Sequence, residues 1–222
     1  KSADNQIKIG IILGFTGPIE SLAPVMAKSA ELAIDEVNKS GNFMDGAQLM
    51  AVRADSTCVD AAAAQAAAER LITSDKVSAI MGADCSGVTT AVLKNVAIPN
   101  GILMISPSAT SPALSTEPDN DLFFRTAPSD ARQGEVIADL LMEKGFKTAA
   151  LTHTNNDYGK GLAASIKSNY EAKGGTITIS ASHEDGKGDY SSEVAALAAD
   201  CAAALAELST ASAFSEVIPV PE

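Results

Sequence analysis

The sequence predicts an α/β fold, a doubly wound parallel sheet covered by helices. One observation is that strand-like and helix-like segments alternate along most of the 222 residues. A second is that the strand-like segments are short and mostly apolar, as in sheets buried on both faces. Such alternation is typical of a parallel sheet, and right-handed crossovers then favour the doubly wound arrangement.

The strands are predicted from apolar runs bounded by Gly, Pro or polar residues. The first begins at Gln6, and its stretch Ile11-Ile12-Leu13 indicates burial on both faces before Gly14 ends it. Six more strands follow, at residues 48–54, 76–82, 101–106, 121–126, 147–153 and 176–182.

The helices are predicted from apolar residues at helical spacing. The first contains Met26, Ala30, Ala33, Ile34 and Val37 and ends at Lys39-Ser40-Gly41. Asp60 is a candidate cap for the Ala-rich segment 61–73, which consists almost entirely of helix formers. The remaining helices are predicted at residues 86–96, 130–144, 158–172 and 191–208.

Two domains are predicted, with a boundary near Phe124-Arg125. A loop rich in Pro, Ser, Asp and Asn precedes the boundary, and the strand–helix pattern restarts after it. The first domain therefore covers residues 1–124 and the second residues 125–208. The tail, residues 209–222, has a weak pattern and predicts no defined structure.

Composition excludes several classes of function. The formal net charge of −12 disfavours binding to nucleic acid or to an anionic membrane surface. No apolar run reaches the roughly 18 residues that a membrane span needs, so no membrane insertion is expected. The chain starts at Lys1, without Met or an apolar signal region. It is therefore either a trimmed cytosolic protein or a mature secreted one.

The three cysteines allow more than one interpretation. Cys58 and Cys85 follow the second and third predicted strands, whose ends can be neighbours in a parallel sheet. They form either a disulfide or two buried free thiols. Cys201 lies in a predicted helix and is most simply a small core residue. No Cys-x-x-Cys pair exists and only His153 and His183 offer imidazoles, so we expect no metal site.

Two strand-to-helix junctions are candidate ligand contacts. In the junction 82–87, Ser86 opens a helix whose free N–H groups suit a carboxylate. The loop 106–112, which includes Ser108, Ala109 and Thr110, is dense in hydroxyls and peptide groups. Both follow carboxyl ends of strands, where open α/β sheets bind ligands. The alternative is that these residues are ordinary helix caps and turns.

Tyr158 opens a later helix and either closes over a ligand or is half-buried under a loop. Signatures of enzymes are poor. The spacing of Gly10, Gly14 and Gly17 does not give a dinucleotide fingerprint, and there is no phosphate loop or nucleophile elbow. We therefore expect no enzyme activity and no cofactor.

Several stretches carry a resemblance to a known family. They are GFTGPIESLAPVMAKSAELAIDEVN, RADSTC, IMGADCSGVTTAVLKNVAIPNGILMISPSATSP, FFRTAPSD and THTNNDYGKGLA. In this order and at these intervals they resemble the periplasmic substrate-binding proteins of branched-chain amino acid ABC transporters, which are type I periplasmic binding proteins. The resemblance runs from about residue 7 to about residue 199.

The resemblance implies two Rossmann-like lobes with a ligand in the cleft between them. It implies a disulfide between Cys58 and Cys85 and hence the periplasm. Ser86 then holds a ligand carboxylate, the Ser108 carbonyl and Thr110 hydroxyl receive the ammonium, and Tyr158 comes from the second lobe. Leu22 stands where relatives often have a cleft aromatic, and the later strands of the second lobe have no counterpart here.

The predicted function is therefore a periplasmic solute-binding protein. It captures a small amino acid or related carboxylate and delivers it to an ABC transporter permease. The alternative is a ligand-sensing domain of a receptor or regulator with the same fold. A nucleotide-using enzyme of doubly wound fold is the third hypothesis, and it lacks the phosphate loop it would need.

Overall fold

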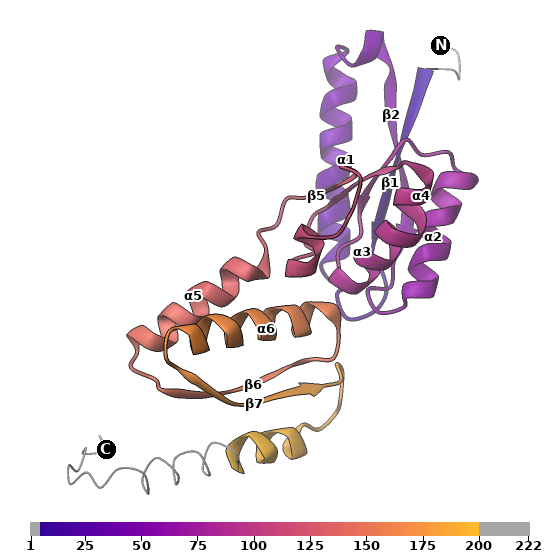
Figure 1. Ribbon diagram of the computed structural model, residues 1–222. Coiled ribbons are helices and arrows are strands. Elements are labelled where there is room, and N and C mark those ends of the chain that lie inside the picture. The colour runs from indigo at the N-terminus through magenta and orange to yellow at the C-terminus, as the bar shows by residue number, and fades with distance from the viewer. Residues whose placement is uncertain (1–4, 200–222) are drawn as a thin grey trace, which may run out of the picture. The chain divides into compact units, whose positions relative to one another are not determined.

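The computed structural model describes residues 5–199, which fall into two compact units (Figure 1). The first unit holds the residues up to Arg132 together with Asn156–Leu162. The second holds Gln133–Asn155 together with the residues from Ala163 onward. Each unit has its own parallel sheet.

The sheet of the first unit has five parallel strands in the order β2-β1-β3-β4-β5. The central strand β1 pairs on one side with β2 and on the other with β3. This order confirms the predicted doubly wound fold, because the chain leaves β1 toward one edge and then crosses to the other. The strands are β1 (Gln6–Leu13), β2 (Gln48–Asp55), β3 (Ala79–Gly82), β4 (Leu103–Ser106) and β5 (Phe123–Arg125).

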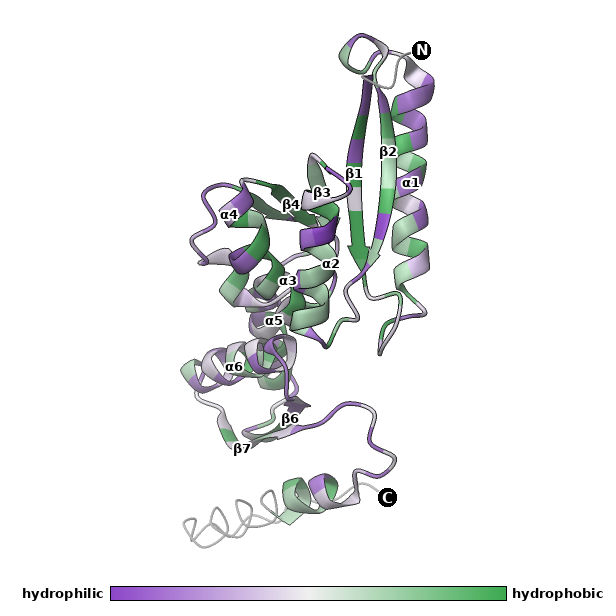
Figure 2. Cartoon of the chain, turned by 90° about the vertical axis from the view of Figure 1, so that its right-hand side faces the viewer, coloured by the Kyte–Doolittle hydropathy of each residue, from purple (hydrophilic) through white to green (hydrophobic). Residues whose placement is uncertain are grey.

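Helices cover the two faces of this sheet unequally. On one face α1 (Ala23–Ser40) runs beside β1 and β2 (Figure 2), packing Ala23 and Ala27 against Ile11. The other face is covered by a larger core, which includes side chains from α2 and α3. The helical elements between β2 and β4 are α2 (Ala61–Thr73), α3 (Ser86–Val92), a π-helical turn (Leu93–Ala97) and α4 (Ile98–Asn100).

The exposure of residues along the sheet follows from this unequal cover. Met104 of β4 and Phe123 of β5 face the larger core and are 0% and 8% exposed. Their chain neighbours Ile105 and Phe124 point to the opposite face and are 38% and 52% exposed. The helix α1 therefore shields β1 and leaves the far strands of its face open to solvent.

Several predicted boundaries need correction. The strand predicted at 76–82 begins only at Ala79, and Lys76 has a φ of 59°, outside the extended region. The strand predicted at 101–106 begins at Leu103, because Gly101, with a φ of 64°, caps α4. The helix predicted at 86–96 is α3 followed by the π-helical turn. The Asp60 cap is confirmed, since its carboxylate accepts from the N–H groups of Ala62 and Ala63 at 2.9 and 3.0 Å.

The second unit pairs β6 (Thr148–Thr154) with β7 (Thr176–His183) in parallel. Most of α5 (Asp130–Glu143) and α6 (Asp157–Ala172) belongs to it. Tyr170 is fully buried in its core beside Ala138 and Ile177, and its hydroxyl donates to the Phe146 carbonyl at 2.9 Å. Gly175 lies against the ring of Tyr170, where a Cβ would come within 2.4 Å of it.

The last described helix covers residues 191–199 and agrees with the start of the helix predicted at 191–208. Cys201 and the predicted tail lie outside the described residues. The 1–124, 125–208 and 209–222 division stays a prediction. No described helix has the length and apolar character that crossing a bilayer requires.

Candidate functional site

The candidate site lies in the first unit, where β1, β3 and β4 end. Successive connections leave β1 and β3 in opposite directions, and such switch points are where open α/β sheets bind ligands. Strand β3 ends at Gly82, whose φ of 128° and close approach to Ile12 exclude any side chain. A Cβ there would lie 2.0 Å from the Ile12 carbonyl oxygen.

Asp84 holds the ends of three strands together. Its carboxylate is 2% exposed and accepts from the Gly14 N–H after β1 at 2.6 Å. It also accepts from the Ser56 hydroxyl after β2 at 3.1 Å and from the Cys85 N–H after β3 at 3.0 Å. Asp84 is therefore a buried carboxylate whose hydrogen bonds are made within the protein.

Ser86 and the loop after β4 are joined directly. The Ser86 hydroxyl, 3% exposed, accepts from the Ser111 N–H at 3.1 Å. Within the part of the chain that the structure describes, this hydroxyl donates to no acceptor. Its proton thus stays available for a ligand oxygen.

Two further hydroxyls support the same loop. The fully buried Ser106 donates to the Ala83 carbonyl at 2.5 Å and accepts from the Ala109 N–H at 3.0 Å. Ser108 donates to the Asp84 carbonyl at 3.0 Å. The ends of β3 and β4 are thereby cross-linked at several points, which fixes the loop that carries Thr110.

Thr110 is also hydrogen-bonded to Asp130, the first residue of α5. Its hydroxyl donates to Oδ2 of Asp130 at 2.8 Å, and its carbonyl accepts from the Asp130 N–H at 2.9 Å. Asp130 is 1% exposed, whereas Thr110 is partly exposed. The Arg125 guanidinium donates to the carbonyls of Ala109 and Ser111, at 3.1 and 2.8 Å, and to the Ser115 hydroxyl.

Burial shapes the electrostatics of this cluster. Loss of hydration raises the pKa of Asp130, against the smaller opposing effects of the Thr110 hydroxyl and the Arg125 charge. Burial likewise lowers the pKa of Arg125, against the attraction of Asp130. The ionised form of Asp130 is therefore less well stabilised than that of an ordinary surface carboxylate.

The expected disulfide is present. Cys58 and Cys85 are joined with their Cα atoms 5.2 Å apart, and the bridge links the loop after β2 to the loop after β3. Of the two interpretations that the cysteine positions left open, the free-thiol one is wrong. The bridge lies one residue before Ser86 and helps to fix that junction.

The structure therefore brings four predicted residues into one cluster and leaves two outside it. Ser86, Ser108, Ala109 and Thr110 share the hydrogen-bonded ends of β3 and β4. Leu22, just before α1, is 58% exposed, and Tyr158, in the first turn of α6, is 43% exposed. Within residues 5–199 neither joins the hydrogen-bonded cluster, and their ligand roles stay predictions.

Four residues of the cluster were not predicted as site residues: Asp84, Ser106, Arg125 and Asp130. An acidic residue directly after a buried strand, as at Asp84, is a usable signal for a buried hydrogen-bonded carboxylate. Asp130 gave no such signal, because it stands 20 residues from Thr110 and looks like any acidic residue at a helix start.

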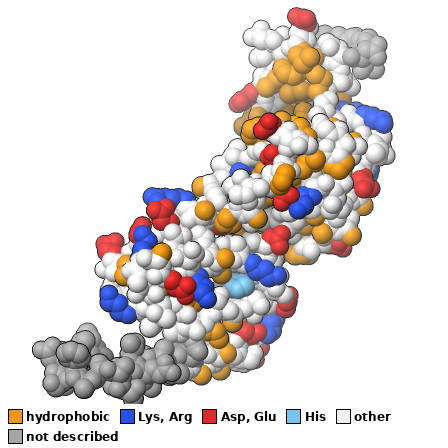
Figure 3. Space-filling view, viewed as in Figure 1, with side chains coloured by type: hydrophobic (Ala, Val, Ile, Leu, Met, Phe, Trp, Pro, Cys, Tyr) orange, Lys and Arg blue, Asp and Glu red, His pale blue; other side chains and the backbone are white. Residues whose placement is uncertain are grey.

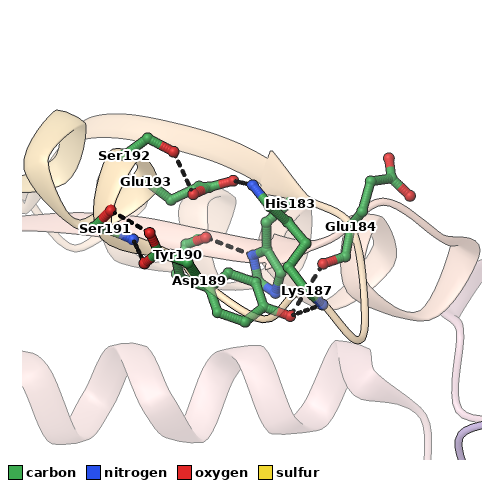
Figure 4. Close-up of polar contacts among 9 residues, drawn as sticks. His183, Glu184, Lys187, Asp189, Tyr190, Ser191, Ser192 and Glu193 are labelled. Carbon is green, nitrogen blue, oxygen red and sulfur yellow. Dashed lines mark hydrogen bonds and ion pairs between the residues drawn. The ribbon is translucent and has the colours of Figure 1, made fainter.

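The second unit carries a separate polar cluster at the end of β7, shown in Figure 4. His183 contacts the Thr152 hydroxyl at 2.7 Å and packs edge-on against Tyr190. Lys187 pairs with Glu193, and hydrogen bonds from Lys187 and Ser192 lower the pKa of Glu193 to about 2. These groups are exposed or partly exposed and pair with one another. Figure 3 shows charged side chains of both signs on the surface of this unit.

Within residues 5–199, no group of three His, Cys, Asp or Glu side chains is placed to hold a metal ion. The candidate site consists of hydroxyls, peptide groups and the buried carboxylates of Asp84 and Asp130. Such groups recognise a small polar solute by hydrogen bonds.

A doubly wound unit with hydrogen-bonding groups at its switch point defines a class of ligand-binding α/β proteins. The periplasmic binding protein family model matches residues 6–219. The chain therefore belongs to the periplasmic binding protein family.

Individual relatives agree with this assignment. The leucine-, isoleucine-, valine-, threonine- and alanine-binding protein of Pseudomonas aeruginosa is 32% identical over 88% of this chain and 51% of its own length. The isoleucine complex of the branched-chain amino acid transporter substrate-binding protein LivJ from Streptococcus pneumoniae has a TM-score of 0.75 and 32% identity. That match covers 87% of this chain and 54% of LivJ.

A solute-binding protein from R. palustris in complex with 4-hydroxybenzoate has the same TM-score of 0.75 at 21% identity. That match covers 88% of this chain and 51% of the other, and at this identity it supports the fold alone. The chain spans about half the length of the curated relatives it matches.

Proposed function

We propose that this chain is the ligand-capturing part of a periplasmic solute-binding protein that serves an ABC importer. Its solute is a small amino acid or a related carboxylate, and it binds the solute without transforming it. The observation that carries the proposal is that the Ser86 hydroxyl is hydrogen-bonded to the loop that carries Thr110, through the N–H of Ser111. One hydroxyl has a proton to give and the other an oxygen that accepts.

The Ser86 and Thr110 hydroxyls suit the two charged ends of a zwitterion. The Ser86 hydroxyl already accepts from the Ser111 N–H, so its proton is free for a carboxylate oxygen. The Thr110 hydroxyl donates to Asp130, so its oxygen is left to accept from an ammonium. Hydrogen bonds to charged groups are stronger than neutral ones, which favours an ionic solute.

We propose binding without reaction because of the chemical groups that the cluster contains. Within the described cluster the Ser86 hydroxyl has no side-chain base beside it, because its hydrogen bond comes from a peptide N–H. The Thr110 hydroxyl donates to the Asp130 carboxylate, which leaves its oxygen as an acceptor. Membership of a family of binding proteins supports the same view.

In the proposed mechanism the first lobe, residues 1–124, binds the solute and the second lobe, beginning at residue 125, closes over it. A ligand that contacts both lobes shifts the open–closed equilibrium toward the closed state. Tyr158 and Leu22 are the side chains that we propose to contact the solute beyond the hydroxyl cluster. The closed complex is what an ABC permease would recognise.

The proposed compartment is the periplasm. The bridge between Cys58 and Cys85 needs an oxidising environment to form and persist. The names of relatives, which include Leu/Ile/Val-binding proteins, support a solute of the amino acid class.

The test is calorimetric titration of the full chain with a panel of amino acids and of aliphatic and aromatic acids. We expect saturable binding of at least one of them, and binding of none would contradict the proposal. Ser86→Ala and Thr110→Ala should each weaken binding by about 1–3 kcal/mol. Thr116→Ala, which removes an exposed hydroxyl bonded only to the Ala113 carbonyl, is the matched control and should bind like the native chain.

A further inference from the structure

The turn after β1, residues 14–17, is held by side chains from other parts of the first unit. The backbone pairing of β1 with β2 ends at Leu13 and Asp55, the last residues of the two strands. Beyond that point carboxylates bind the turn. Asp84 accepts from the Gly14 N–H at 2.6 Å, and Asp55 binds Thr16, two residues further on.

Both carboxylate oxygens of Asp55 contact Thr16. Oδ2 accepts from the Thr16 hydroxyl at 2.6 Å, and Oδ1 accepts from the N–H groups of Thr16 and Thr57 at 3.3 and 2.8 Å. Burial raises the pKa of Asp55, but hydrogen bonds from Thr16 and from peptide N–H groups together outweigh burial and leave the pKa below its ordinary value. Asp55 is therefore ionised at neutral pH and holds the turn as an acceptor.

The residues on either side of Thr16 also follow the end of β2. The Arg53 guanidinium lies 5.4 Å from the centre of the Phe15 ring, and two hydrogen bonds to Glu31, at 2.6 and 2.7 Å, orient it. A Cβ on Gly17, whose φ is 93°, would lie 2.4 Å from the carbonyl oxygen that follows β2 at position 57. The turn therefore has little freedom of its own.

This turn borders the candidate site. A Cβ on Gly14 would lie 3.3 Å from Cys58 and 3.4 Å from the carboxylate of Asp84. The turn thus packs against the disulfide and against the segment that leads into Ser86. A solute held by the Ser86 hydroxyl has this turn and the residues that follow it as a neighbouring wall.

Two backbone hydrogen bonds connect the turn with Leu22, which we propose as a solute contact. The Glu20 N–H donates to the Gly17 carbonyl at 3.2 Å, and the Leu22 N–H donates to the Ile19 carbonyl at 2.9 Å. The path from Thr16 to Leu22 is therefore short and internally bonded, so a displacement at its start also moves its end.

We propose that Asp55 is a positioning residue for the side chain of the solute. By holding Thr16 it fixes the segment that ends at Leu22, and this segment limits the size of the side chain that fits. The inference rests on the proposed function and deepens it, because it assigns the choice among amino acids of different size to a residue outside the hydroxyl cluster.

The test is the ratio of the affinities for leucine and alanine, measured by calorimetric titration of the full chain. The two probes share the ammonium and the carboxylate and differ only in the side chain. The native chain should bind leucine about tenfold or more tightly, because an apolar wall gains from the larger side chain. In Asp55→Ala the turn loses its acceptor, and the ratio should move toward one by about threefold or more.

Two further variants separate positioning from stability. Asp55→Asn keeps an oxygen for the two peptide N–H groups, so its ratio should stay within about twofold of the native one. Asp60→Ala is the matched control, because Asp60 also accepts two peptide N–H groups in the first unit, but at the start of α2. Its ratio should equal that of the native chain. Should Asp55→Ala not fold, Thr16→Val removes the hydroxyl donor at an exposed position and should move the ratio in the same direction.

The outcomes distinguish this inference from the binding function. An unchanged ratio in Asp55→Ala, or in Thr16→Val where that variant replaces it, would overturn the positioning role. So would an equal shift in Asp60→Ala, which would trace the effect to lost stability, or a shift in Asp55→Asn as large as in Asp55→Ala. A native chain that binds both amino acids without preferring leucine overturns the inference and leaves the binding function intact. A native chain that binds neither overturns both.

Discussion

At the scale of single residues, two buried carboxylates have opposite roles in the first unit. Asp84 receives three hydrogen bonds and joins the ends of β1, β2 and β3. Asp130 receives one side-chain bond and keeps an oxygen free. Stability therefore depends on the first, whereas burial disfavours the ionised form of the second.

Removing the Asp84 carboxylate should destabilise the fold strongly. Asp84→Ala leaves the Gly14 N–H, the Cys85 N–H and the Ser56 hydroxyl without their acceptor in a buried place, so we expect a loss of about 2–4 kcal/mol. Asp60→Ala is the matched control, because Asp60 also accepts two backbone N–H groups but is exposed at a helix cap. It should lose only about 1 kcal/mol. Denaturant unfolding measures both, and equal losses would contradict this role for Asp84.

Replacing Asp130 should have the opposite effect on stability. Burial holds its pKa above the ordinary value, so the protonated form stabilises the folded state in acid and that contribution is lost as the pH rises through the folded pKa. At neutral pH the ionised group is unfavourable, because the effect of burial outweighs the Thr110 hydrogen bond and the attraction of the Arg125 charge. Asp130→Asn without ligand should thus melt at or above the native temperature near pH 7, as checked by thermal unfolding. The difference should shrink as the pH falls into the ordinary range of Asp, and a lower melting temperature at neutral pH would contradict the prediction.

The residue types in the cluster were predictable, and their hydrogen-bond roles were not. Ser86 and Thr110 both follow predicted strands, so strand ends alone placed them at the same edge of the sheet. Which hydroxyl donates and which accepts depends on Ser111 and Asp130, at sequence distances of 25 and 20. No local pattern encodes contacts between such distant positions.

At the scale of elements, the alternation of side chains along β4 and β5 decides which of them are buried in the core and which are exposed. Met104 and Phe123 point into the core with α2 and α3, and Ile105 and Phe124 point to the face that α1 only partly covers. The apolar runs predicted buried strands, but a run that is apolar on both faces carries no information on which helix covers which face.

Two neighbouring substitutions in β4 test this difference. Met104→Ala opens a cavity at a fully buried position and should lower the free energy of unfolding by about 2–5 kcal/mol. Ile105→Ala acts on a side chain that is 38% exposed and should lower it by less than about 1 kcal/mol. Denaturant unfolding of the two variants gives the comparison. Equal destabilisation would mean that the second face is covered in solution.

At the scale of the whole molecule, the alternation of strands and helices was enough to predict a doubly wound parallel α/β fold, and the family resemblance implied two lobes. It could not predict the strand order, because a crossover can place the next strand on either side of the previous one. Strand starts were also misplaced, as at Lys76 and Gly101, because a residue with positive φ interrupts an apolar run without changing its composition.

The disulfide should make a measurable contribution to the stability of the molecule. A bridge between residues 27 apart removes loop entropy from the unfolded chain, worth about 3.5 kcal/mol in the chain-entropy model. The double variant Cys58→Ser/Cys85→Ser should therefore lose about that amount in denaturant unfolding. It should also bind more weakly, because the bridge fixes the junction just before Ser86. Unchanged stability would show that the bridge does not constrain the unfolded chain.

The central claim is that the hydroxyls of Ser86 and Thr110 hold a small zwitterion at the switch point of the first sheet and leave it chemically unchanged. Calorimetric titration of the full chain with leucine, set against the same titration of Ser86→Ala, tests it most directly. We expect each native chain to bind one leucine, which is recovered intact, and the affinity of the variant for leucine to be at least about tenfold weaker. Equal affinity in the two proteins, or conversion of the leucine, would contradict it.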